Sequence, residues 1–192
     1  MAPRAYRSTK RAEAVEETRR RITEAVVQLH REKGVIATTY EDIARRADVA
    51  PATVYRHFPS ADDLLPACGA RILEITLPPG PGIFDGKRTQ FLRLQALVQE
   101  LFGFWQRVEP WLSVGRCEAP NVPALAAGIR AWDEDIRTLI GFALGEGADE
   151  NVVRLVQAMT DFYVWRAFAR QGLEREAPNI ITETLANRLC FR

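Results

Sequence analysis

The chain has 192 residues, of which 47% are hydrophobic and 27% charged, a composition typical of soluble globular proteins. Its 26 basic and 25 acidic side chains nearly cancel, so overall charge does not indicate a nucleic-acid partner. No apolar run approaches the ~20 residues of a membrane-spanning helix, and no charged-then-apolar leader opens the chain, so we expect a cytoplasmic protein without membrane association.

Residues 1–14 are predicted to form a short basic arm. The first twelve residues carry four cations and no acid: Arg4, Arg7, Lys10 and Arg11. Such a terminus is either a disordered, solubilising extension or an arm that tracks DNA phosphates or enters the minor groove. Charge pattern alone leaves both interpretations open.

Farther along, apolar residues recur at spacings of three and four, and sustained apolar–polar alternation is absent. This periodicity predicts an all-α fold. The first helix is expected from Val15 to Lys33, with Ile22 and Val26 on its apolar stripe. Gly34 follows, and glycine suits the left-handed turn that ends a helix.

Overlapping capping-box patterns predict the start of a short second helix. Thr38 precedes Glu41 by three residues, and Thr39 precedes Asp42 by the same spacing. In such a box the hydroxyl and the carboxylate satisfy backbone amides at the helix start. We therefore expect a helix from Tyr40 to Ala47.

A tight turn at residues 48–49 leads to a predicted third helix. Pro51 occupies the first helical position, where proline is favoured. Ser60, with Asp63 three residues later, is expected to cap a fourth helix that continues to about Thr76.

The proline- and glycine-rich stretch 77–86 is expected to be a loop between two domains. Residues 15–76 would form a three-helix helix-turn-helix domain with its connecting fourth helix, and residues 87–192 a larger helical domain, giving about nine helices in all. Helical segments in the second domain are predicted over residues 91–105, 111–117, 124–144, 152–170 and 180–189.

Two short helices joined by a tight turn match the helix-turn-helix motif. In that motif the second helix enters the DNA major groove, so one face must anchor to the protein while the other offers small or hydrogen-bonding side chains. Val49, Val54 and Phe58 are the predicted anchors. The side chains left to face outward are Ala52, Thr53, Tyr55, Arg56 and His57.

The run from Gly34 to Ser60 resembles the signature of the TetR (tetracycline-repressor) family, above all in the block Thr-Val-Tyr-Arg-His-Phe at residues 53–58 beside the Thr38-Thr39 helix start. The resemblance covers roughly residues 15–65. It implies a dimeric transcriptional regulator, commonly a repressor, that binds palindromic double-stranded DNA and is released by a small-molecule effector.

The resemblance also implies roles for single residues. Thr39 would cap its helix against a phosphate, and Thr53, Tyr55 and His57 would contact backbone phosphates. Residues 50–52 and Arg56 would lie closest to base edges. With the basic arm, the expected DNA-binding set is Arg4, Arg7, Lys10, Arg11, Thr38, Thr39, Ala50, Pro51, Ala52, Thr53, Tyr55, Arg56 and His57.

Four positions depart from the family pattern. Asp48 and Ala52 stand where the family often has glycine, Ala50 replaces a common capping serine, and Ala61 replaces a frequent phosphate-contacting lysine. These departures affect the individual DNA contacts rather than the class of protein.

The second domain has a heavy aromatic load, which at helical spacing indicates either a packed core or an apolar pocket for a small ligand. The residues that such a pocket would use are Phe102, Trp105, Gln106, Trp111, Arg116, Trp132, Met159, Phe162, Tyr163 and Arg166.

A two-fold interface is expected from the last two predicted helices, because the helix at 152–170 is apolar on more than one side. Two copies could bury these stripes in a four-helix bundle. The candidate interface residues are Val152, Val156, Met159, Tyr163, Ile181, Leu185 and Leu189. Effector binding would then favour a conformer whose recognition helices no longer match the two half-sites, with the fourth helix transmitting the movement.

Three other functions are alternatives to an effector-released DNA-binding repressor. An enzyme is disfavoured because only His30 and His57 are present and no catalytic or phosphate-binding motif appears. A thiol-based redox sensor could use Cys117 or Cys190, although Cys68, Cys117 and Cys190 lack the spacing of a disulfide framework or a zinc site. A protein-binding module without DNA affinity is the third. No metal or cofactor is predicted.

Overall fold

The computed structural model describes residues 4–189, with side chains from Lys10 onward. Within this range the chain is helical and contains no strand, which confirms the all-α prediction. No helix in the described range combines the length and the apolar character needed to cross a membrane.

The chain divides into two compact units. The first runs through Ile75 and also takes in Pro110–Ile129, and the second comprises Thr76–Glu109 and the residues from Arg130 onward. The sequence placed all of 87–192 in one domain, whereas residues 110–129 pack with the first unit. Two of the boundaries between the units, after Glu109 and after Ile129, therefore fall inside long helices. No loop-forming stretch in the sequence marks these positions.

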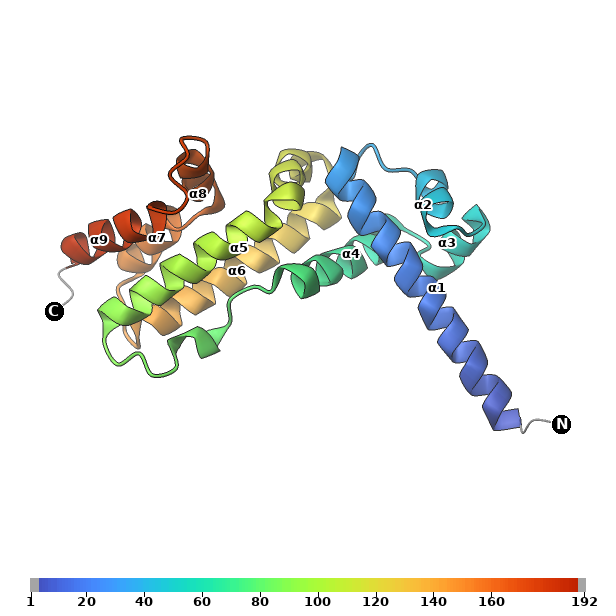
Figure 1. Ribbon diagram of the computed structural model, residues 1–192, viewed down its shortest axis with the longest axis horizontal. Helices are drawn as coiled ribbons and strands as arrows, with labels where there is room; N and C mark the ends of the chain where they lie inside the picture. Colours follow the sequence, from blue (N-terminus) through green and yellow to red (C-terminus); the bar gives the residue numbers. More distant parts are fainter. Residues whose placement is uncertain (1–3, 190–192) are drawn as a thin grey trace. The chain divides into compact units, whose positions relative to one another are not determined.

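The first unit begins with four helices that surround one apolar core: α1 (Arg4–Lys33), α2 (Tyr40–Ala47), α3 (Pro51–His57) and α4 (Ala61–Thr76). Figure 1 shows α2 and α3 beside α1. The last three helices have the predicted bounds. The core of the four helices includes the buried side chains of Ile22 and Val26 of α1, Ile43 of α2 and Val54 of α3, together with Phe58.

The first helix begins at Arg4 rather than at Val15, so the predicted arm is helical from that residue. Residues 4–14 contain neither glycine nor proline, so nothing in them breaks a helix. Lys10 and Arg11 are exposed. The side chains of Arg4 and Arg7 lie outside the described residues.

A helical hairpin follows. Helix α5 (Gln90–Glu118) and helix α6 (Pro123–Leu144) run through both units, and two short 3₁₀ turns, Pro81–Phe84 and Ala119–Asn121, lie before and after α5. The expected separate helix at 111–117 is instead the end of α5. Pro110 is accommodated inside that helix, although proline removes one backbone hydrogen bond.

The remaining helices of the second unit are α7 (Glu150–Met159), α8 (Phe162–Ala169) and α9 (Ala177–Leu189). The single helix expected at 152–170 is thus two helices. Asp161 breaks it, since its carboxylate accepts the Tyr163 amide at 2.8 Å and so caps a new helix start.

The core of the second unit is aromatic. Trp105 of α5 is almost fully buried, packs edge-on against Phe162 with ring centroids 5.9 Å apart, and donates its indole N–H to the Thr160 carbonyl at 2.8 Å. The backbone carbonyl at the break between α7 and α8 is therefore satisfied from α5. Phe104 and Trp165 extend the same cluster.

Candidate nucleic-acid interface

Helix α3 divides into an anchored face and an open face. Val54 and Phe58 are completely buried, as predicted for the anchors, while Val49 is half-buried. The opposite face is accessible, with Thr53 and His57 half-buried and the following residues exposed: Ala50, Pro51, Ala52, Tyr55 and Arg56. The residues of α3 that are expected to contact DNA are therefore at least partly accessible to solvent.

The start of α2 is fixed by a capping box of Thr39 and Asp42. The Thr39 hydroxyl accepts the Asp42 amide at 3.1 Å, and the Asp42 carboxylate accepts the Thr39 amide at 3.3 Å. Of the two overlapping boxes in the sequence, this one forms, and the Thr38 hydroxyl instead donates to the Gly34 carbonyl at 2.6 Å. Hydrogen bonds from Lys33 and Thr39 hold the pKa of Asp42 well below its usual range.

Helices α2 and α3 also contact each other through two aromatic rings. Tyr40 and Tyr55 stack with centroids 4.4 Å apart and planes inclined by 19°. Tyr55 remains 49% exposed. Burial, with smaller contributions from Tyr55 and Asp63, raises the pKa of Tyr40. The stack therefore restrains the Tyr55 ring while about half of the side chain remains accessible.

Two arginines on α1 bind the C-terminal ends of the two motif helices, and neither was among the residues predicted from the sequence. Arg21 donates to the carbonyls of Ala47 and Asp48, the latter at 2.9 Å. Arg19 donates to the His57 carbonyl at 3.1 Å and lies over the Phe58 ring at 4.2 Å. A cation at a helix C-terminus offsets the negative end of the helix dipole. The only sequence signal was the run Arg19-Arg20-Arg21.

The turn between the helices uses the predicted aspartate. Asp48 adopts the left-handed conformation, with φ 53° and ψ 56°, at the C-cap of α2. Aspartate tolerates this region better than most residues. The turn therefore forms without the glycine that is common in the family pattern.

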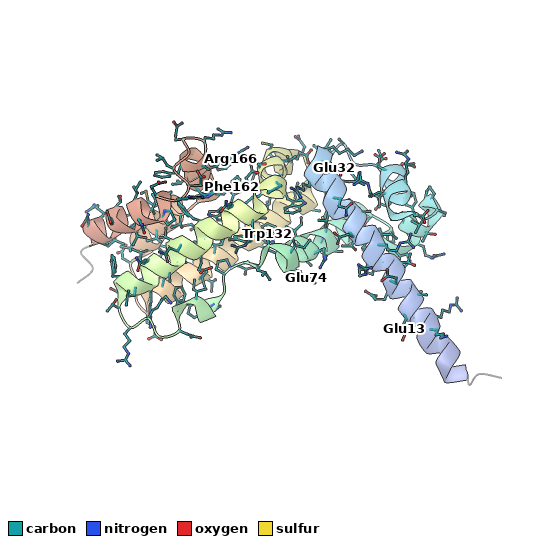
Figure 2. The ribbon with its side chains drawn as sticks, viewed as in Figure 1. Glu13, Glu32, Glu74, Trp132, Phe162 and Arg166 are labelled. Carbon is teal, nitrogen blue, oxygen red and sulfur yellow. The ribbon has the colours of Figure 1, made fainter. Side chains whose placement is uncertain are left out.

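The two arginines of α2 are engaged in ion pairs. Arg46 pairs with Glu32 of α1 at 2.7 Å, and Arg45 lies 3.3 Å from Asp42. Glu32 lies near the C-terminal end of α1 (Figure 2). On α3, burial and then the neighbouring Arg56 and Arg19 lower the pKa of His57.

The end of α5 is bound to the helix-turn-helix through the loop after α1. The Glu118 carboxylate accepts the amides of Val35 at 2.6 Å and Ile36 at 3.4 Å. Trp111, expected in a ligand pocket, instead donates to the Val27 carbonyl of α1 at 2.8 Å. With Arg116 it belongs to the first unit, apart from the other expected pocket residues.

The second unit contains an open cavity of about 410 Å³, lined by Gln106, Glu109, Trp165, Arg166, Ala169 and Arg170. Two of the expected polar anchors, Gln106 and Arg166, are among these residues. Glu109 and Arg170 were missed, although each lies one helical turn from an expected anchor. The remaining expected residues do not line the cavity: Phe102, Trp105 and Phe162 are core, Trp132 and Met159 are half-buried, and Tyr163 is exposed.

The expected interface residues fall into two groups. Val156, Ile181 and Leu185 are buried within the protomer, so they cannot offer a surface to a second copy, which corrects that part of the expectation. Val152, Met159 and Leu189 are half-buried, and Tyr163 is 50% exposed. Ile180 of α9 and Leu173, just before it, are additional exposed apolar side chains.

The cysteines differ in environment. Cys68 is buried with its Sγ 3.4 Å from Nδ1 of His30, and burial raises the pKa of its thiol to about 12. Cys117 is exposed. Cys190 lies outside the described residues. No group of side chains suited to holding a metal occurs in the described part of the chain.

Comparison with known proteins identifies the helix-turn-helix. Residues 22–68 match the family of bacterial regulatory proteins described as the tetR family. Over 87 residues the chain is 30% identical to the HTH-type transcriptional regulator YvdT of Bacillus subtilis, a match that covers 45% of each protein.

Solved structures extend the similarity over most of the chain. SCO7518 of Streptomyces coelicolor A3(2) aligns with a TM-score of 0.67 at 23% identity, covering 89% of this chain and 97% of that one. A TetR transcription regulator of Haloarcula marismortui gives 0.62 at 24% identity, over 90% and 96%. GusR of Salmonella enterica gives 0.60 at 20% identity, over 88% and 94%. At these identities the similarity establishes the fold.

Proposed function

We propose that the protein is a transcriptional regulator that binds double-stranded DNA through α3, because residues 22–68 match the tetR family of bacterial regulatory proteins. The observation that carries the proposal is the open face of α3, where hydroxyl, guanidinium and imidazole groups gather over a buried anchor. The match to a family of regulatory proteins supports this function over an enzyme.

The contacts follow from the chemistry of that face. Arg56 is exposed and can bind guanine O6 and N7 with two donors or grip a phosphate. Tyr55, Thr53 and His57 carry groups suited to phosphate oxygens. Thr39 lies at the N-terminus of α2, where the helix dipole favours an anion. Arg19 and Arg21 act indirectly, because both are directed at backbone carbonyls of the motif helices.

Two copies would bind a palindrome, since a single short recognition helix contacts too few base pairs for specificity in a genome. The dimer surface would use the exposed apolar side chains near and on α8 and α9: Tyr163, Leu173 and Ile180. Repression is the mode that we propose, with DNA release when an effector occupies the cavity of the second unit.

Arg107 connects the cavity-lining turn of α5 to the end of α4. It lies between the lining residues Gln106 and Glu109 on α5, and its guanidinium donates to the carbonyls of Thr76 and Leu77 at 2.6 and 2.9 Å. Thr76 is the last residue of α4. A ligand that shifts this turn of α5 would therefore displace the end of the helix that follows the recognition helix.

The experiment is selection of DNA sites from a random duplex pool, followed by fluorescence anisotropy on the selected site over a salt series. A palindromic motif and a steep loss of affinity with salt are expected, because each neutralised phosphate releases counterions. Arg56→Gln should weaken specific binding about tenfold or more and relax the base preference. Arg45→Gln on α2 is the matched control.

If the selection returned no motif, this would contradict sequence-specific DNA binding and favour a protein-binding module without DNA affinity. The redox alternative is tested on the same duplex. Cys117→Ser should leave the effect of mild peroxide on DNA binding unchanged. A peroxide response that disappears in Cys117→Ser would instead favour a thiol sensor.

A further inference from the structure

The cavity of the second unit is lined by charges from two helices. Gln106 and Glu109 lie one turn apart on α5, whereas Arg166 lies on α8 and Arg170 is the C-cap residue of that helix, one turn after Arg166. Figure 2 shows Arg166 and Phe162 on α8. The cavity volume of about 410 Å³ falls within the range of small-molecule sites.

The charge balance of this lining favours an anion. Glu109 lies 3.6 Å from Arg166, so these two charges offset each other. Arg170 also lines the cavity, is exposed, and forms no ion pair with any residue that the structure describes. One guanidinium is therefore in excess. Any ligand entering the cavity meets two guanidinium groups and one carboxylate, so an anion is attracted on balance and a cation is repelled.

The geometry of guanidinium groups indicates which class of anion the cavity would bind. Arginine presents a planar set of donors that matches a carboxylate with two parallel hydrogen bonds. Gln106 adds a neutral amide, which can donate to a carboxylate oxygen or accept from a ligand hydroxyl. The side wall is apolar, formed by Ala169 and by the edge of Trp165, which is 5% exposed.

We propose that this cavity binds a small organic acid, its carboxylate on Arg170 and Arg166 and its apolar or aromatic body on Trp165 and Ala169. This proposal names the chemical class of the effector. It rests on the proposed regulatory function only in expecting that the bound acid changes DNA binding. Binding itself is a property of the second unit. Glu109 acts in this site as the carboxylate that holds Arg166 when no acid is bound.

The test uses three probes of nearly equal shape and different charge, namely benzoate, benzamide and benzamidine. Each is titrated into the full-length chain by isothermal titration calorimetry at low salt. Benzoate should bind at least about tenfold more tightly than benzamide, and benzamidine least. This order follows because a charge-assisted hydrogen bond contributes more than a neutral one.

Variants assign the binding to the cavity. Arg170→Gln should weaken benzoate about tenfold or more and leave benzamide unchanged. Glu109→Gln should strengthen benzoate severalfold, because it frees Arg166 and removes a like charge. Arg154→Gln is the control, since Arg154 lies on α7 outside the cavity and pairs with Glu150.

Benzamidine binding most tightly would overturn the proposal, because Glu109 would then determine the charge of the ligand. Equal binding of the three probes, or no saturable binding of any, would overturn it as well. The selected DNA duplex separates this result from the regulatory proposal. DNA binding without benzoate binding would contradict only the proposal of an organic-acid ligand. Benzoate binding without DNA binding would contradict only the proposed regulatory function.

Discussion

The guanidinium of Arg107 lies against the backbone carbonyl of Thr76, with its Nε 2.6 Å from the oxygen. A second donor of the same group reaches the Leu77 carbonyl at 2.9 Å. Leu77 itself has φ of 49°, a left-handed conformation that is uncommon for a branched side chain. The chain leaves α4 through this unusual residue, and Arg107 satisfies the carbonyls on both sides of the bend.

Arg107→Gln should remove the hydrogen bonds that join α5 to the end of α4. We expect the free energy of unfolding to fall by about 1 kcal/mol, since hydrogen bonds from a charged donor are lost at a partly exposed site. Amides around Thr76 should exchange faster with solvent, and effector addition should release less DNA. Urea unfolding and hydrogen exchange measure the first two effects. Unchanged exchange at these amides would contradict the role of Arg107, and Arg154→Gln is again the control.

Arg19→Gln and Arg21→Gln should each weaken DNA binding several-fold, although neither residue belongs to the set proposed to contact DNA. The reason is that each loses a cation bound to the C-terminal carbonyls of α3 or α2. Arg20→Gln provides a matched control, because Arg20 is the neighbouring arginine and pairs with Glu17 on an exposed surface. Anisotropy on the selected duplex measures the difference. Equal losses for all three variants would indicate general charge attraction instead.

Gly34→Ala and Gly128→Ala should change stability in opposite directions. Gly34 has φ of +85°, and an added Cβ would lie 2.5 Å from the Glu118 carboxylate and 2.9 Å from Val114. We expect a loss of about 1–3 kcal/mol through backbone strain and through displacement of Glu118. Gly128 lies within α6, and an added Cβ would meet no atom within 4 Å. There alanine should add about 0.5–1 kcal/mol. Thermal or urea unfolding of the pair tests both signs.

Stability should fall in mild acid because of His30. Burial lowers the pKa of His30 to about 4 from an ordinary value of 6.5. Between these two pH values the unfolded chain binds a proton that the folded protein excludes, so lowering the pH favours unfolding. The loss should be fully developed near pH 4 and reach at most about 3 kcal/mol.

The contribution of His30 is isolated by comparison with His30→Gln, which does not titrate. Unfolding free energies of both proteins should be measured from pH 7 to pH 4, where acidic groups such as Asp42 affect the two proteins alike. The difference between the curves should change only below about pH 6.5. Parallel curves across the whole range would show that His30 is not buried as described.

Local signals in the sequence were sufficient for the helix-turn-helix. The Thr39 and Asp42 box, Pro51 at a first helical position and the Ser60 and Asp63 pair each act within a few residues, so the bounds of α2, α3 and α4 could be predicted. The inward direction of Val54 and Phe58 follows in the same way from helical periodicity.

Tertiary structure decided what depends on residues far apart in the chain. Arg19 and Arg21 bind carbonyls 38 and 26 residues away, and Glu118 binds an amide 83 residues away. No local pattern marks such partners. The same holds for the aromatic residues, because Trp105, Trp111 and Trp165 look alike in sequence, yet they serve respectively in a core, in a bond to α1 and beside a cavity. Periodicity fixes which side of a helix is apolar, whereas packing alone fixes what covers it.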